Sequence, residues 1–135
     1  MTLSVLGSGA FGSALAIAIA QKGMHVTLWS RSKDAARAMQ DTRENAARLA
    51  GHRFPDTLSV TDDIALATQN DILLLAVPMQ QLRSLVQQYK TIFQGKTLVA
   101  CCKGIELNSG AGPCDILGEY AEKIALLTGP SFAHD

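Results

Sequence analysis

The chain has 135 residues and carries 12 basic and 12 acidic side chains, so its formal net charge is zero. Because 47% of its residues are hydrophobic, we expect one globular domain, and the balanced charge gives no indication of a nucleic acid or an anionic membrane as partner. No apolar run is long enough to span a bilayer, and the three cysteines fit no disulfide framework. We therefore expect a cytoplasmic protein without a signal peptide.

The first thirty residues have the pattern of a strand–helix–strand unit. A short apolar run, an alanine-rich helix and a second strand follow one another at residues 2–6, 10–22 and 24–29. The turn between the first strand and the helix reads G-x-G-x-x-G. Gly7 allows the tight turn, Gly9 leaves room for a pyrophosphate, and Gly12 lets the helix lie close to the strand. The N–H groups at the helix start then face an anion, which predicts a dinucleotide site.

Strands and helices continue to alternate through the rest of the chain. Further strands are predicted at residues 58–61, 72–77, 97–101 and 123–127. Helices are predicted at residues 32–49 (with 41–45 as a candidate interruption), in a brief segment capped by Thr61 or Asp62, and at residues 80–93 and 113–120, with a loop at residues 50–57. This alternation predicts an α/β fold of Rossmann type, a doubly wound and mainly parallel six-stranded sheet in the order 3-2-1-4-5-6.

The end of the second predicted strand bears on the choice of cofactor. A site for NAD usually has Asp or Glu there to bond the ribose 2′-OH. This chain has Ser30 and Arg31, and its next carboxylate is Asp34, inside the following predicted helix. A hydroxyl followed by Arg can bind a 2′-phosphate, which favours NADP(H) over NAD(H) while leaving NAD(H) as an option. Alternatively, Ser30 caps the next helix and Arg31 is solvated.

Two groups at later strand ends are candidates for chemistry. Lys103 can contact the cofactor, polarise a carbonyl or pair with a substrate anion, or it is a solvated lysine at a strand end. Ser131 can hydrogen-bond a ligand or cap a helix, and it lacks the G-x-S-x-G pattern of a hydrolase nucleophile. Cys101 is expected in the core and Cys102 as a partly exposed thiol near the crevice. Neither the histidines nor the cysteines have the spacing of a metal site, so we expect no metal.

Together these motifs resemble the N-terminal domain of bacterial NAD(P)-dependent glycerol-3-phosphate dehydrogenase. The resemblance covers all 135 residues and is carried by residues 7–16, 28–31, 76–78, 103–106 and 129–133. With the glycine loop, it implies a cofactor site made of Gly7, Ser8, Gly9, Ala10, Phe11, Gly12, Ser30, Arg31, Lys103 and Ala133. It also implies that Lys103, Gly129 and Ser131 contact the substrate.

The resemblance further implies an activity and different roles for two domains. The family exchanges hydride between NAD(P)H and dihydroxyacetone phosphate, giving sn-glycerol 3-phosphate for phospholipid synthesis. Its proton-transferring lysine belongs to a C-terminal helical domain that is absent from residues 1–135, so we expect cofactor binding without turnover and no catalytic residue here. The alternatives are a related 3-hydroxyacid or ketopantoate-type reductase, and a stand-alone nucleotide-sensing module. The sequence leaves a homodimer of the full-length protein open.

Overall fold

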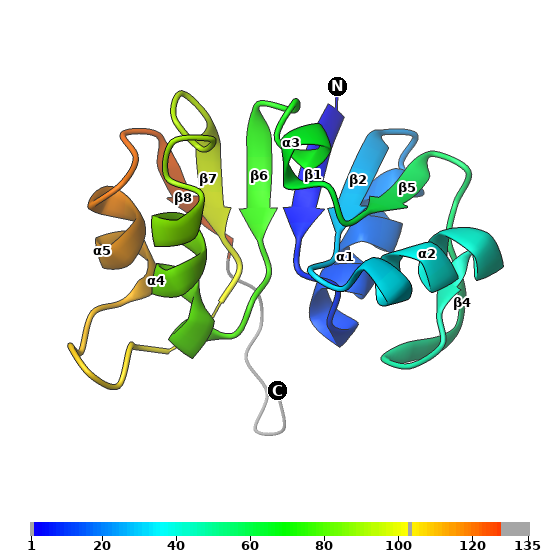
Figure 1. Cartoon of the computed structure of the whole chain (residues 1–135), viewed down its shortest axis with the longest axis horizontal. Helices are drawn as coiled ribbons and strands as arrows, with labels where there is room; N and C mark the ends of the chain where they lie inside the picture. Colours follow the sequence, from blue (N-terminus) through cyan, green and yellow to red (C-terminus); the bar gives the residue numbers. More distant parts are fainter. Residues whose placement is uncertain (1, 103, 128–135) are drawn as a thin grey trace.

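The computed structural model describes residues 2–102 and 104–127 (Figure 1). The strands are β1 (Thr2–Leu6), β2 (His25–Trp29), β3 (Glu44–Asn45), β4 (Leu49–Arg53), β5 (Leu58–Thr61), β6 (Ile72–Leu75), β7 (Thr97–Ala100) and β8 (Ile124–Leu126). The helices are α1 (Ala10–Ala20), α2 (Lys33–Thr42), α3 (Ile64–Ala67), α4 (Met79–Gln88) and α5 (Pro113–Gly118). None of these described helices is long and apolar enough to cross a bilayer.

Six strands form one sheet in the order β5-β2-β1-β6-β7-β8, and every neighbouring pair is parallel. This is the predicted Rossmann order; only the numbering differs, because the additional strands β3 and β4 pair antiparallel as a separate hairpin. The parallel strands place their carboxyl ends along one edge, where the loop to α1 and the loop to α4 leave the sheet (Figure 1). Ligands of such folds bind outside this edge.

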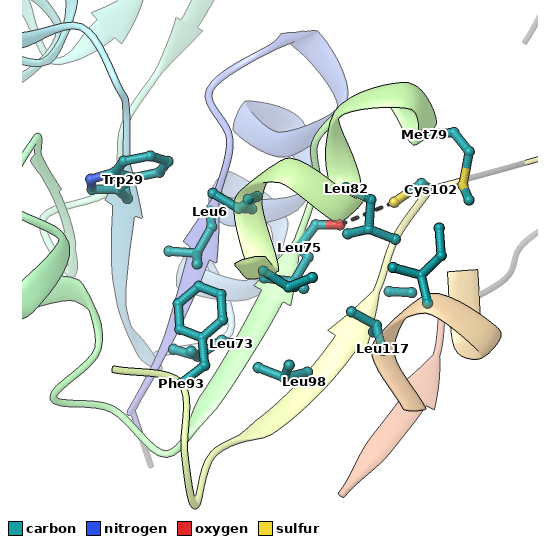
Figure 2. Packing of buried hydrophobic residues seen from close by; sticks show 14 of the residues in the cluster. Leu6, Trp29, Leu73, Leu75, Met79, Leu82, Phe93, Leu98, Cys102 and Leu117 are labelled. Carbon is teal, nitrogen blue, oxygen red and sulfur yellow. Dashed lines mark hydrogen bonds between the residues drawn. The ribbon is translucent and has the colours of Figure 1, made fainter. Parts of the chain in front are cut away.

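Helices cover both faces of the sheet. Buried side chains of α1 and α2 pack against one face together with Val5, Leu28 and Leu58. Side chains of α3, α4 and α5 pack against the other face in a cluster that includes Leu6 and Leu75 (Figure 2). Burial on both faces explains why the central strands read as continuous apolar runs instead of alternating with polar residues.

The helix predicted at residues 32–49 ends at Thr42, inside the candidate interruption at residues 41–45. Strand β4 (Leu49–Arg53) occupies the last residue of that predicted helix and the first part of the loop predicted at residues 50–57. The helix stops because Arg43 adopts a left-handed backbone conformation with φ of 61°. Its guanidinium group donates hydrogen bonds to the carbonyl oxygens of Pro55 at 2.9 Å and Leu58 at 2.6 Å. These long-range bonds outweigh the helical propensity of the residues that follow.

Other boundaries differ by a few residues from the predicted ones. The N-cap of α3 is Asp63 and not Thr61 or Asp62, because the Asp63 carboxylate accepts from the backbone N–H of Ala65 at 3.0 Å. Strand β6 ends at Leu75, two residues before its predicted end. Helices α1, α4 and α5 also end before their predicted last residues.

Candidate functional site

The three glycines of the first loop have different surroundings. Gly7 has a φ of 119°, and a Cβ placed on it would lie 2.3 Å from the Ala76 carbonyl oxygen. A Cβ on Gly12 would lie 2.1 Å from the Gly7 carbonyl oxygen. Around Gly9, in contrast, a Cβ would meet no described atom within 4 Å. At its two ends the loop is closely packed, Gly7 against Ala76 and Gly12 against Gly7, and it is open in the middle at Gly9. A binding site for a ligand requires such an opening.

Helix α1 begins directly behind this opening. Gly9 is its N-cap, and the first helical hydrogen bond runs from the Ser13 N–H to the Gly9 carbonyl oxygen at 3.0 Å. The backbone N–H groups of Ala10, Phe11 and Gly12 have no acceptor inside the helix, as in every helix start. Together with the positive end of the helix dipole, they favour an anion at this place. Phe11 is 56% exposed and borders the same opening.

Hydrogen bonds from side chains of β3 and of the loop itself hold the glycine loop in place. The Ser8 hydroxyl donates to the Ser30 hydroxyl oxygen at 3.1 Å, which joins the loop to the end of β2. The Asn45 side-chain amide donates to the Ser8 carbonyl oxygen at 2.8 Å and to the Ser13 hydroxyl oxygen at 2.9 Å. The β3–β4 hairpin is thus tied to the glycine loop through Asn45, a contact that the sequence analysis missed.

Ser30 and Arg31 follow β2 in different environments. Ser30 is buried and does not cap α2, so the predicted role of Ser30 as a cap is wrong. The cap is Ser32, whose hydroxyl oxygen accepts from the Ala35 N–H at 3.2 Å. Arg31 is exposed and forms no ion pair with the described residues. Its guanidinium group is available to an anionic ligand at the end of β2.

The cysteines after β7 are both buried. Cys101 lies in the core, as predicted, and burial raises the pKa of its thiol to about 11. The expected partial exposure of Cys102 is wrong: the residue is 8% exposed and its Sγ donates to the Leu75 carbonyl oxygen at 3.7 Å. Burial also raises the pKa of the Cys102 thiol. Both groups are therefore protonated near neutral pH and take part in packing.

The segment after residue 103 is held against α4. The Gln80 side chain donates to the Ile105 carbonyl oxygen at 2.9 Å and accepts from the Leu107 N–H at 2.9 Å. The Arg83 guanidinium group donates to both carboxylate oxygens of Glu106, at 3.0 Å and 3.1 Å. These contacts fix the start of this segment at the carboxyl edge of the sheet.

Comparison with known proteins gives the family. Residues 2–135 match the family described as NAD-dependent glycerol-3-phosphate dehydrogenase N-terminus. The chain belongs to this family.

The chain aligns over its full length with proteins named glycerol-3-phosphate dehydrogenase. It is 54% identical to a glycerol-3-phosphate dehydrogenase (NAD(P)+) of Ruegeria sp. (strain TM1040) and 50% identical to the protein of the same name from Roseobacter denitrificans. Each alignment includes 100% of the chain and 42% of the relative, so the chain spans about two fifths of the length of these relatives. The crystal structure of a glycerol-3-phosphate dehydrogenase from Coxiella burnetii superposes with a TM-score of 0.88 at 26% identity, over 98% of this chain and 42% of that one.

The described residues include most of the expected dehydrogenase cofactor site. Six consecutive residues of the glycine loop, 7–12, lie at the carboxyl edge, and Ser30 and Arg31 follow the neighbouring strand at the same edge. Four expected site residues lie outside the described residues: Lys103, Gly129, Ser131 and Ala133. Among the described residues no group of three or more His, Cys, Asp or Glu side chains could hold a metal ion.

The carboxylate of Glu106 is expected to stabilise this dehydrogenase domain in a pH-dependent way. Hydrogen bonds from Ser109 and Arg83 lower its pKa below the ordinary value of 4.5. Its contribution is therefore fully present above about pH 4.5 and is lost as the pH falls through the lowered pKa. Glu106→Gln should reduce the melting temperature by a few degrees at pH 7, and the difference from wild type should shrink in acid.

Glu119→Gln is the matched control for this prediction. Glu119 also pairs with Arg83, but its side chain is 53% exposed, compared with 11% for Glu106. Water screens an exposed pair, so this variant should lose less stability at pH 7. Thermal melts that show the same loss for both variants, or a Glu106→Gln deficit that does not depend on pH, would contradict the assignment.

Proposed function

We propose that the chain is the NAD(P)-binding domain of a glycerol-3-phosphate dehydrogenase. The observation that carries this proposal is the open position at Gly9, directly in front of the α1 start, between two glycines that are closed against backbone. A pyrophosphate needs both features: close approach to the backbone and N–H groups that point at it. The nicotinamide group supplies the hydride when the cofactor is bound.

In this proposal the glycine loop binds the pyrophosphate of the cofactor, and the residues after β2 bind the adenosine ribose at its 2′ position. The cofactor contacts are assigned to Gly7, Ser8, Gly9, Ala10, Phe11, Gly12, Ser30 and Arg31. The Ser30 hydroxyl is neutral, and its oxygen accepts from Ser8. The charge that selects a 2′-phosphate therefore comes from Arg31. NADP(H) is the preferred cofactor, and NAD(H) also fits the loop because the pyrophosphate is common to both.

The substrate end of the site is assigned by family membership. Lys103 contacts both cofactor and substrate, Ala133 contacts the cofactor, and Gly129 and Ser131 contact dihydroxyacetone phosphate or glycerol 3-phosphate. Residues 1–135 then form one cofactor domain that binds without turnover, and the proton-transferring lysine belongs to a helical domain outside this chain. We place the full-length protein in the cytoplasm, as a source of glycerol 3-phosphate for phospholipid synthesis.

An activity assay of the complete protein tests the substrate assignment. NADPH should be oxidised when dihydroxyacetone phosphate is added, with sn-glycerol 3-phosphate as product. Turnover of a ketopantoate-type or 3-oxoacid substrate in place of dihydroxyacetone phosphate would support the related reductase instead. Binding of the nucleotide with no turnover of any of these substrates would support a sensing module.

Replacement of Arg31 by alanine tests the cofactor preference. Loss of a charge-assisted bond to the 2′-phosphate should weaken NADPH binding by about tenfold. NADH has no 2′-phosphate, so its affinity should stay within about twofold. Trp29, the one tryptophan of the chain, immediately precedes Ser30 and provides the fluorescence signal for both titrations.

The control for this variant is Arg37→Ala, which removes the same charge from an exposed position on α2. It should leave both affinities unchanged, since Arg37 is not among the proposed cofactor contacts and an exposed charge that touches no ligand is screened by salt. Equal losses for NADPH and NADH in Arg31→Ala, or no loss for either, would remove the case for Arg31 as the 2′-phosphate ligand.

A further inference from the structure

The Asn45 side chain uses all of its polar groups inside the protein. The residue is 4% exposed, and its amide nitrogen donates to the Ser8 carbonyl oxygen at 2.8 Å and to the Ser13 hydroxyl oxygen at 2.9 Å. Its amide oxygen accepts from the Arg48 N–H at 3.2 Å. Each end of the amide has partners of the correct type, which fixes its orientation. The hairpin residue Asn45 is thus a rigid donor pointed at the glycine loop.

The Ser8 carbonyl oxygen accepts two side-chain hydrogen bonds. It accepts from Asn45 and also from the Ser13 hydroxyl at 3.3 Å. Peptide bonds are planar, and none of the described ones is cis. The carbonyl of the Ser8–Gly9 peptide and the N–H of Gly9 therefore point in opposite directions. With the carbonyl held inward, the Gly9 N–H points to the open side of the loop, where a Cβ on Gly9 meets no described atom within 4 Å.

We propose that Asn45 is a positioning residue for the dinucleotide: it locks the Ser8–Gly9 peptide with its N–H toward the pyrophosphate and its carbonyl away from it. This inference rests on the proposed cofactor site. Gly9 makes the lock necessary, because a glycine accepts the change of φ that a peptide flip requires. The flipped peptide would present a carbonyl oxygen to the phosphates and replace an attraction by a repulsion.

Two substitutions of Asn45 distinguish the effect of its hydrogen-bond donor from the effect of its side-chain size. Asn45→Ala removes the amide and should weaken NADPH binding by about tenfold, the loss expected for one hydrogen bond to a charged group. Asn45→Asp keeps the size and the acceptor for the Arg48 N–H but sets a carboxylate oxygen against the Ser8 carbonyl. This variant should favour the flipped peptide and bind NADPH more weakly than Asn45→Ala.

A second ligand distinguishes positioning from a general loss of structure. Adenosine 2′-monophosphate has no pyrophosphate, so its affinity, measured by displacement of NADPH, should stay within about twofold of wild type in both Asn45 variants. A purely structural role of Asn45 would weaken both ligands together or leave both unchanged. The comparison therefore reports on the phosphate-binding peptide alone.

Two further variants complete the test. Glu44→Ala removes a hairpin side chain that accepts from the Gly51 N–H and makes no hydrogen bond to the glycine loop among the described residues, so NADPH affinity should be unchanged. Ser13→Ala removes one of the two donors to the Ser8 carbonyl from within α1, where alanine is favourable, and serves if the Asn45 variants do not fold. It should weaken NADPH binding by about threefold without affecting adenosine 2′-monophosphate.

These measurements distinguish the role of Asn45 from the cofactor site itself. The inference is supported if the wild-type chain binds NADPH and the Asn45 and Ser13 variants lose NADPH affinity but keep their affinity for adenosine 2′-monophosphate. Wild-type binding with unchanged affinity in these variants, or with equal losses for both ligands, overturns the role of Asn45 and leaves the cofactor site intact. A wild-type chain that does not bind NADPH overturns the cofactor site and the inference together.

Discussion

Replacement of Gly12 by alanine is expected to destabilise the chain by about 3 kcal/mol or more, a large part of the stability of an ordinary domain. The added Cβ would lie 2.1 Å from the Gly7 carbonyl oxygen and 3.2 Å from the Ala76 Cβ. Neither the carbonyl nor the strand end can rotate away as a long side chain could. Helix α1 would have to move away from β1 and take its buried residues with it. Denaturant unfolding measures the loss.

Gly9→Ala is the matched control, since it makes the same substitution three residues earlier. A Cβ at Gly9 meets no described atom within 4 Å, and its φ of −69° suits any residue. The free energy of unfolding should change by less than about 1 kcal/mol. Similar losses of stability for the two alanine variants would show that the contact of Gly12 with Gly7 does not determine the packing of α1.

Replacement of Gly9 by glutamate is expected to weaken NADPH binding by about a hundredfold or more while the fold stays intact. The side chain enters the open space in front of α1, so it would displace the pyrophosphate and set a negative charge where the phosphates bind. A carboxylate at a helix N-terminus is favourable for stability, so the melting temperature should not fall. Titration of Trp29 fluorescence with NADPH measures the affinity.

The charge-matched control for this variant is Gln21→Glu. Gln21 is exposed at the opposite end of the same helix, so the substitution adds the same charge far from the loop. NADPH affinity should remain within about twofold of wild type. If Gly9→Glu also binds NADPH as wild type does, the pyrophosphate does not lie at the α1 start.

The parallel sheet and the glycine loop could be predicted from the sequence alone. Buried parallel strands are apolar without interruption, and residues 72–75 show this pattern clearly. The glycine motif became informative because a strand precedes it and a helix follows it within a few residues. These are local signals, and the structure confirms the elements that they predict.

Between α2 and β5 the sequence predicted a candidate interruption at residues 41–45, where the helix does end, but it did not predict the β3–β4 hairpin. Residues 43–49 contain several good helix formers, so local propensity continues the helix. Arg43 ends it through bonds to Pro55 and Leu58, which are distant in the sequence. Asn45 was missed for the same reason, because its partners Ser8 and Ser13 lie more than thirty residues earlier. A single sequence does not reveal such pairs.

The burial of Cys102 was also missed. Its position after β7 indicated an exposed strand end, but side chains of α4 and α5 cover this thiol in the cluster that contains Leu82 and Leu117 (Figure 2). Coverage by a neighbouring helix depends on how the layers pack, and the pattern along one strand does not contain this information.

The most direct test of a cofactor site at the glycine loop is calorimetric titration of the 135-residue chain with NADPH. One molecule should bind per chain, and NADH should bind more weakly. An absence of binding at millimolar NADPH, from a chain that melts cooperatively, would contradict the assignment of residues 7–12 as the phosphate-binding loop.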